Sequence, residues 1–213
     1  MKAVIFDLDG LLIDSETTIW PKSITEFLLS KGILYTDEVR EKARGSGHKE
    51  TIEIFKKNLD LKGNIENLVA EMRSYFFKNF LLSPALITGS KEFLEGLSKK
   101  EYLLAVATGL GPKNCVIDLL SRLEIKKYFK QITTGDEATR GKPDPQIYLI
   151  TAKKLGVKPS ECLVLEDAVN GVMAGKAAEM KVFGINKDEK NKKELKKAGA
   201  DKVFSGLLEI EDL

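Results

Sequence analysis

The sequence has few of the residues that build disulfide frameworks or zinc sites. It contains two cysteines, Cys115 and Cys162, which lie far apart in apolar contexts and form no CxxC pair. We interpret them as structural thiols. His48 is the only histidine, which argues against a zinc site or a His/Asp relay of the usual kind.

The sequence also lacks a long hydrophobic run. No apolar stretch approaches the ~18–20 residues of a membrane span. The first one, Ala3–Phe6, is interrupted at once by Asp7 and Asp9, unlike the apolar region of a signal peptide. We therefore expect a cytoplasmic protein without a membrane partner.

A strong excess of charge of one sign is missing as well. The 34 Lys and Arg residues nearly balance the 32 Asp and Glu residues, giving a net charge of +2. In the densest lysine run, Lys187–Lys197, acids are interleaved, which is typical of a solvated helix face. This balance predicts no nucleic-acid partner. We expect a monomer or a weak homodimer.

Short apolar runs alternate with helical patterns along much of the chain. In the pattern after residue 140, we expect Asp144 to cap a helix whose first position is Pro145. Strands that alternate with helices predict an α/β protein with a doubly wound parallel sheet. The strands that we expect are Ala3–Phe6, Leu103–Ala107, Cys162–Leu165 and Val182–Ile185, with Gln131–Thr134 and Lys202–Phe204 as weaker ones.

One stretch, residues 15–84, breaks this alternation. It shows helical periodicity and no convincing strand, with Ile24, Phe27 and Leu28 on one predicted face. We interpret it as an all-helical domain inserted after the first strand. Residues 1–14 and 85–213 would then form the α/β core.

Polar residues follow several of the predicted strands. Because parallel strands end at the same edge of a sheet, ligands bind beyond that edge. Each residue alone is weak evidence, and Asp144 is adequately explained as a helix cap. The residues at this edge are Asp7, Asp9, Thr108, Gly109, Lys142, Glu166 and Asp167.

Clustered carboxylates repel one another unless a cation lies among them, and oxygen ligands without His or Cys favour Mg²⁺. Phosphoryl transfer needs an in-line nucleophile and cations around the transferring group. Asp7 and Asp9, two residues apart, are separated by roughly 6–7 Å along an extended chain. They can therefore flank one reacting centre, and Gly10 permits a sharp turn after them.

These motifs resemble those of the haloacid dehalogenase superfamily. Residues 7–15, DLDGLLIDS, resemble its first motif, and the matches to the later motifs, in order along the chain, are Thr108, Lys142 and Glu166-Asp167. The helical insertion resembles the cap of the β-phosphoglucomutase-like branch. The resemblance implies a Rossmann-like core in which the first strand is flanked by the second and the fourth.

The resemblance also implies roles for these residues. Asp7 would be the nucleophile and a Mg²⁺ ligand, and Asp9 the general acid/base, which also offers its backbone carbonyl to the metal. Thr108, with Gly109 beside it, and Lys142 would bind the transferring phosphoryl group.

Asp167 would be a further Mg²⁺ ligand, with Glu166 a ligand or close to one. The expected function is Mg²⁺-dependent hydrolysis of small phosphomonoesters, such as sugar phosphates, through an aspartyl-phosphate. The substrate partner would be a small phosphorylated metabolite.

A phosphomutase of the β-phosphoglucomutase type is the alternative. In the resemblance, a catalytic histidine of the mutase matches Ile19, and an arginine that binds the distal phosphate matches His48, with Lys49 next to it. His48 and Lys49 are candidate substrate contacts, and a solvated polar loop explains them equally well. These replacements favour the phosphatase.

Two further classes fit the motifs less well. A haloacid dehalogenase needs neither a metal nor a second aspartate, so Asp9 and Glu166-Asp167 argue against it. A receiver-type signalling module has an acidic Mg²⁺ pocket and a phosphorylated aspartate, but no large insertion after the first strand.

Overall fold

The computed structural model describes residues 1–213 except 16, 44–47, 83–84 and 212. The chain divides into two compact units. The first, here called the sheet unit, comprises residues 1–14 and 85–213, and the second, the helical unit, comprises residues 15–84. Each unit is described below by itself.

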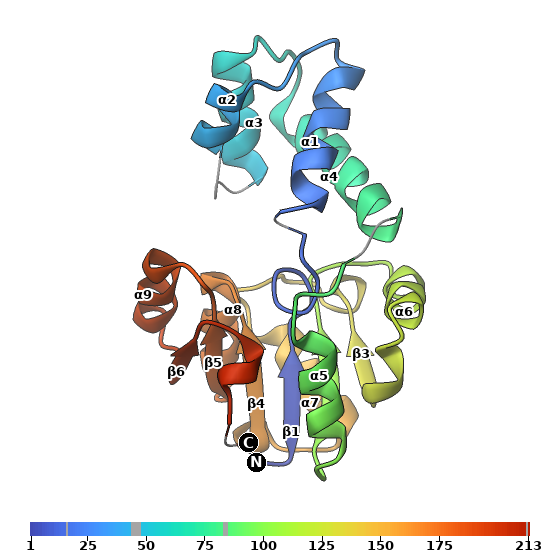
Figure 1. The fold of residues 1–213 in the computed structure, drawn as a ribbon, viewed down its shortest axis with the longest axis vertical. Coiled ribbons are helices and arrows are strands. Elements are labelled where there is room, and N and C mark those ends of the chain that lie inside the picture. The colour runs from blue at the N-terminus through green and yellow to red at the C-terminus, as the bar shows by residue number, and fades with distance from the viewer. Residues whose placement is uncertain (16, 44–47, 83–84, 212) are drawn as a thin grey trace. The chain divides into compact units, whose positions relative to one another are not determined.

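The sheet unit contains a six-stranded parallel sheet in the order β3-β2-β1-β4-β5-β6 (Figure 1). This arrangement confirms the predicted doubly wound α/β fold, and β1 lies between β2 and β4 as the resemblance implied. The strands are β1 Ala3–Phe6, β2 Leu103–Ala107, β3 Gln131–Thr133, β4 Cys162–Glu166, β5 Lys181–Ile185 and β6 Lys202–Phe204.

Helices cover both faces of this sheet (Figure 1). On one face Phe6 of β1 packs edge-on against Phe93 of α5, with ring centroids 6.2 Å apart. On the other face Ile5 packs in a cluster with residues of α7 and α8. Successive residues of a strand point to opposite faces, so β1 is buried on both sides, which explains its purely apolar sequence. The helices are α5 Ser90–Ser98, α6 Lys113–Arg122, α7 Gln146–Leu155, α8 Val169–Ala177 and α9 Glu189–Lys197.

Four element boundaries differ from those expected. Strand β3 ends at Thr133 instead of Thr134, and β5 begins at Lys181 instead of Val182. Helix α7 begins at Gln146, one residue later than predicted, with Pro145 at the N-cap position. The Asp144 carboxylate still accepts a hydrogen bond from the Gln146 N–H at 3.0 Å. Strand β4 extends through Glu166 instead of ending at Leu165, because the backbone of Glu166 still pairs with Gly184 of β5.

The described part of the helical unit consists of helices and connecting turns, with no strand. Phe27 and Leu28 of α1 are fully buried there and form a core with Phe55 of α3 and Met72 of α4. Helices α1 and α4 are further joined by Asn79, whose side-chain amide donates to Ser23 at 3.2 Å. The helices are α1 Ile19–Ser30, α2 Asp37–Ala43, α3 His48–Asn58 and α4 Ile65–Leu82.

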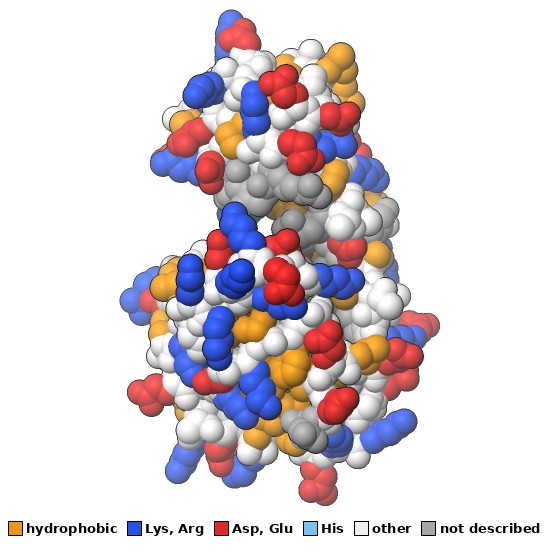
Figure 2. Space-filling model, turned by 60° about the vertical axis from the view of Figure 1, so that its left-hand side comes forward, with side chains coloured by type: hydrophobic (Ala, Val, Ile, Leu, Met, Phe, Trp, Pro, Cys, Tyr) orange, Lys and Arg blue, Asp and Glu red, His pale blue; other side chains and the backbone are white. Residues whose placement is uncertain are grey.

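The surface matches the balanced composition. Figure 2 shows Lys and Arg side chains mixed with Asp and Glu side chains over the face that it presents. Among the described residues, no helix is both long and apolar enough to cross a bilayer.

Candidate active site

The register of the sheet brings the first and fourth motifs together. Phe6 of β1 pairs with Val106 of β2 on one side and with Leu165 of β4 on the other. Asp7, one residue further, therefore lies level with Ala107 and Glu166, and its N–H donates to the Leu165 carbonyl at 3.0 Å. The carboxyl ends of three neighbouring strands thus meet at Asp7.

Lys142 lies at the centre of this group. Its ammonium donates to Asp7 Oδ1 at 2.5 Å, to Glu166 Oε1 at 2.5 Å and to the Ala107 carbonyl at 3.2 Å. Burial alone would lower the pKa of Lys142, but the carboxylates of Asp7 and Glu166 outweigh burial and raise this pKa well above its usual value. Lys142 is therefore a fixed positive charge between two acids.

Three carboxylates, those of Asp7, Glu166 and Asp167, each offer an oxygen within 4.8 Å of the others. Burial, together with the neighbouring Glu166 and Asp9 and against the opposing effect of Lys142, raises the pKa of Asp7 to about 7. Burial and the other acids also raise the pKa of Asp167 well above 3.8. One lysine does not offset this many acids. A hard divalent cation fits a site of three carboxylate oxygens, because it favours their ionised forms.

This excess of negative charge predicts how the metal-free protein responds to pH. The pKa of Asp7 is about 7 in the folded protein against 3.8 for the unperturbed group, so the folded state holds a proton that the unfolded state releases. The free energy of unfolding should therefore fall as pH rises from about 4 to about 7. Unfolding by urea in EDTA, measured at pH 5 and pH 8, checks this.

A comparison with Asp7→Asn makes that measurement specific. In Asp7→Asn the loss of stability between pH 5 and pH 8 should be smaller, because one of the two carboxyl groups of the site with a raised pKa is gone. The remaining change combines Asp167, whose raised pKa lowers stability as pH rises, with His48, whose lowered pKa acts in the opposite direction. If the wild type in EDTA is as stable at pH 8 as at pH 5, or more stable, the conclusion that the site buries uncompensated negative charge is wrong.

Two glycines make room for the acids. A Cβ on Gly171 of α8 would lie 1.9 Å from the Glu166 carboxyl carbon, and one on Gly10 would lie 2.1 Å from Asp167 Oδ2. Gly10 also has a φ of +85°, so the sharp turn after Asp9 uses a conformation that glycine adopts most easily. The acids can approach one another because these positions carry no side chain.

Asp9 lies on the turn that follows β1. Gly10 and Ile13 close this turn with a backbone hydrogen bond of 2.9 Å. Among the described residues, the side chain of Asp9 is not part of the group of three possible metal ligands. Its charge nevertheless contributes to the raised pKa of Asp167, after burial and the charges of Glu166 and Asp7.

Thr108 and Gly109 follow β2 at the same edge. Thr108 is buried, and its hydroxyl accepts a hydrogen bond from the Leu110 N–H at 3.2 Å, so the turn after β2 is held by the side chain that begins it. Gly109 is exposed, and a Cβ on Gly135 would lie 2.3 Å from its carbonyl oxygen. The two loops can pass this closely only with a glycine at 135.

Sequence reasoning missed one member of the network, Tyr148. Its hydroxyl donates to Glu166 Oε1 at 2.5 Å. The available signal was general, since a buried tyrosine needs a partner for its hydroxyl. Neither spacing nor periodicity indicated which partner.

Both candidate contacts in the helical unit, His48 and Lys49, are helical rather than loop residues. His48 and Lys49 begin α3, and residues 45–47 lie outside the described part of the chain. The ring of His48 lies 4.7 Å from that of Trp20, and Trp20, which packs against this unit's core, stacks on Phe76 at 4.2 Å. Partial burial and nearby Arg73 hold the pKa of His48 below its usual value.

Residues 4–185 match the family described as haloacid dehalogenase-like hydrolases. The chain belongs to this family. The match covers most of both units and includes all the clustered residues of the sheet edge. It agrees with the resemblance that the motifs suggested.

Relatives within the family are named phosphatases. A phosphorylated carbohydrates phosphatase from Thermotoga maritima is 34% identical over 204 residues, covering 94% of this chain and 92% of that protein. Hexitol phosphatase B from Escherichia coli is 30% identical over 198 residues, covering 84% and 81%. A crystal structure from Thermotoga maritima, assigned provisionally as a beta-phosphoglucomutase, has 32% identity and a TM-score of 0.80, with 99% and 96% covered.

Proposed function

We propose that this family member is a Mg²⁺-dependent phosphatase that hydrolyses small phosphorylated carbohydrates through an aspartyl-phosphate on Asp7. The observation that carries the proposal is the bridge from Lys142 to Asp7 and Glu166, each at 2.5 Å, beside a third carboxylate. The lysine and the nucleophile suit phosphoryl transfer, but the further acids would repel a dianionic phosphoryl group. A bound cation is therefore needed to balance their charge.

In the first step, a carboxylate oxygen of Asp7 attacks phosphorus in line with the ester oxygen. The new bond joins Asp7 to phosphorus, the ester P–O bond breaks, and Asp9 gives its proton to the departing alcohol oxygen. Lys142 and Thr108 bind the equatorial oxygens of the transferring group, where charge must be stabilised in the transition state.

In the second step, Asp9 takes a proton from water, whose oxygen attacks the same phosphorus. The bond between phosphorus and Asp7 breaks, inorganic phosphate leaves, and the Asp7 carboxylate is regenerated. Asp9 thus acts first as acid and then as base, while the proton that it loses in one step returns in the next.

The metal would be held by the side chains of Asp7 and Asp167, with Glu166 a ligand or close to one and the Asp9 carbonyl as a further ligand. When bound, it lowers the pKa of the acids and neutralises phosphoryl charge. Asp7, whose pKa is about 7 without the metal, would then be ionised and nucleophilic at neutral pH.

The substrate class is inferred from the relatives. The first of them is named for phosphorylated carbohydrates and the second for hexitols, and both cover at least four fifths of this chain. Hydrolysis of a panel of hexose, pentose and hexitol phosphates, with phosphoglycolate and nucleotide monophosphates as comparisons, tests this class. No phosphate release from any of them in Mg²⁺ would contradict the proposal.

Removal of the metal should abolish this activity. Phosphate release should be lost in EDTA and return with added Mg²⁺, because the acids otherwise repel the substrate. Asp167→Asn should raise the Mg²⁺ concentration for half-maximal rate by about tenfold or more, since it removes one charged ligand. A titration of initial rate against free Mg²⁺ measures both effects.

A matched control is Asp118→Asn, which removes a carboxylate from a largely exposed ion pair with Arg122 on α6. Its Mg²⁺ dependence should equal that of the wild type. An unchanged dependence in Asp167→Asn would remove Asp167 from the ligand set. Full activity after chelation would favour dehalogenase-type chemistry instead.

The phosphomutase alternative has a specific test. Ile19, at the position of the mutase histidine in the resemblance, begins α1, is buried and offers no group for proton transfer. Water should therefore be the ordinary acceptor of the phosphoryl group. With β-glucose 1-phosphate, Mg²⁺ and a trace of the bisphosphate, free phosphate should form faster than glucose 6-phosphate, and the reverse order would establish a mutase.

A further inference from the structure

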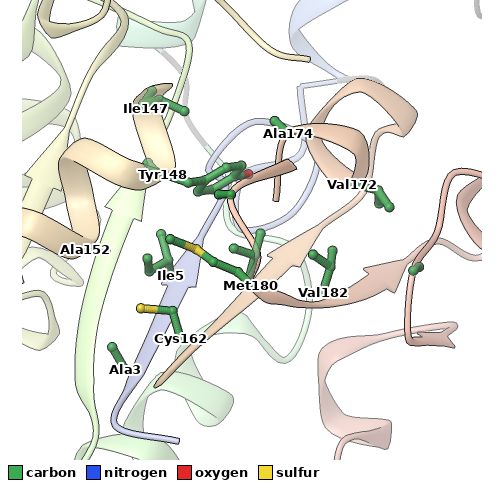
Figure 3. Close-up of a cluster of buried hydrophobic side chains, with 14 of the residues drawn as sticks. Ala3, Ile5, Ile147, Tyr148, Ala152, Cys162, Val172, Ala174, Met180 and Val182 are labelled. Atoms are coloured by element: carbon green, nitrogen blue, oxygen red, sulfur yellow. The ribbon is translucent and has the colours of Figure 1, made fainter. Parts of the chain in front are cut away.

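Tyr148 is a buried tyrosine to which the proposed reaction assigns no role. It projects from α7 into the apolar cluster between the sheet and α8, close to Ile5 and Met180 (Figure 3). The residue has no solvent exposure. A phenylalanine would fill the same space with equal burial, so packing alone does not explain the hydroxyl.

The hydroxyl lies at the acidic cluster. It donates to Glu166 Oε1 at 2.5 Å, the same oxygen that receives the Lys142 ammonium at 2.5 Å. The other oxygen, Oε2, accepts from the Ala168 N–H at 3.3 Å. Two donors on Oε1 and one on Oε2 fix both the position and the rotation of the Glu166 carboxylate.

The ring of Tyr148 contributes a second interaction with the same lysine. Lys142 Nζ lies 4.9 Å from the ring centroid, within the range of a cation–π contact. Burial, followed by the charge of Glu166, raises the pKa of Tyr148 well above its usual value. The phenol therefore stays protonated and remains a donor at neutral pH.

We propose that Tyr148 is a positioning residue, whose hydroxyl fixes the Glu166 carboxylate that aligns the Lys142 ammonium on Asp7. Lys142 reaches three acceptors, and only Glu166 among them is a mobile side chain that does not itself react. If Glu166 turns, the ammonium can shift toward it and away from Asp7. A small displacement of a group that stabilises the transition state costs rate more than binding.

The kinetic part of this inference rests on the proposed phosphatase function. The test is Tyr148→Phe, which keeps the ring and deletes only the hydroxyl. The kcat for phosphate release should fall about tenfold or more, with KM changed less than about twofold. Tyr128→Phe is the matched control, because it deletes an exposed hydroxyl that donates to Glu95 at 3.0 Å.

A double-mutant cycle shows whether Tyr148 acts through Glu166. The variant Glu166→Met replaces the carboxylate with an unbranched side chain that has no oxygen to accept the hydrogen bond from Tyr148. In this background, Tyr148→Phe should have little further effect on kcat. If this variant does not fold, Glu166→Gln replaces it, and the effect of Tyr148→Phe should shrink. An equal loss in both backgrounds, an unchanged kcat, or a rise in KM alone would overturn the inference.

The urea midpoints of the same four proteins give a readout that needs no activity. Tyr148→Phe should lower the midpoint in the wild-type background and less so, or not at all, beside Glu166→Met. If the wild type releases no phosphate, the proposed function fails, and this unfolding cycle still decides whether the hydroxyl holds Glu166. Additive shifts of the midpoint would show that it does not.

Discussion

Asp7→Asn should abolish phosphate release while the protein stays folded. The substitution keeps the size and shape of the side chain and removes the charge that attacks phosphorus. Because Asp7 is the one residue to which the proposed mechanism assigns the attack, the rate should fall by on the order of 10³-fold or more. Initial rates of phosphate release from the best substrate of the panel measure this loss.

The stability of Asp7→Asn separates a chemical role from a structural one. The pKa of Asp7 is raised to about 7 by burial and by Glu166, so ionised Asp7 is costly to the metal-free fold at neutral pH. The amide oxygen of asparagine can still accept the hydrogen bond from Lys142. In EDTA at pH 8, the variant should therefore unfold at the urea concentration of the wild type or above it.

Asp188→Asn is the control for this change. Asp188 caps α9 by accepting from the Asn191 N–H at 3.0 Å, and asparagine caps a helix equally well. Its activity and stability should match those of the wild type. If Asp7→Asn retains more than a few per cent of the wild-type rate, the covalent mechanism is wrong.

The sheet could be predicted from the sequence because its strands are buried on both faces. A strand such as Val182–Ile185 must then be almost purely apolar, and an apolar run of that length between turns has few other interpretations. The end of β4 was missed because Glu166 is charged. The backbone of Glu166 pairs with β5, while its side chain lies in the acidic cluster. Composition alone does not indicate that one residue has both roles.

The candidate site could be predicted as a set of residues but not as a network. Strand ends and motif order brought Asp7, Lys142 and Glu166 to one edge. That Lys142 bridges the two acids depends on side-chain rotamers and on the loop after β3, which no periodicity describes. Tyr148 was missed for the same reason, since its helical spacing is explained by burial alone.

The helical unit was predicted as helical from its apolar faces, and its core confirms Phe27 and Leu28 on one of them. For His48 and Lys49, the sequence left a substrate contact and a solvated polar loop as equally good explanations. Both residues lie in α3, which runs from His48 to Asn58 and buries Phe55. The role of both residues in binding substrate stays a prediction.

Lys142→Met should have the second large effect, and it should act on both rate and stability. Methionine keeps an unbranched chain of similar length without the charge. The negative charge on the transferring group is then balanced less in the transition state, so kcat should fall by about 10²-fold or more while KM changes less. A rise in KM alone would show that Lys142 supplies uniform binding and has no special role in the chemical step.

The stability effect follows from the acids that Lys142 leaves behind. Removing one partner from a buried group of charges costs about 3–5 kcal/mol, because the remaining charges lose their compensation. Asp7 and Asp167 can avoid this cost by taking up protons, and their raised pKa values make that easy below pH 6. The loss of stability in EDTA should therefore be large at pH 8 and small at pH 5.

A matched lysine tests this reasoning. Lys154 pairs with Glu137 near the surface, so Lys154→Met should cost at most about 1 kcal/mol, with no such dependence on pH. Saturating Mg²⁺ should restore part of the stability of Lys142→Met, because a bound cation takes over the compensation of the acids. An equal loss for the two lysines at pH 8 would mean that the acids of the cluster do not depend on Lys142, and the charge balance proposed for this site would be wrong.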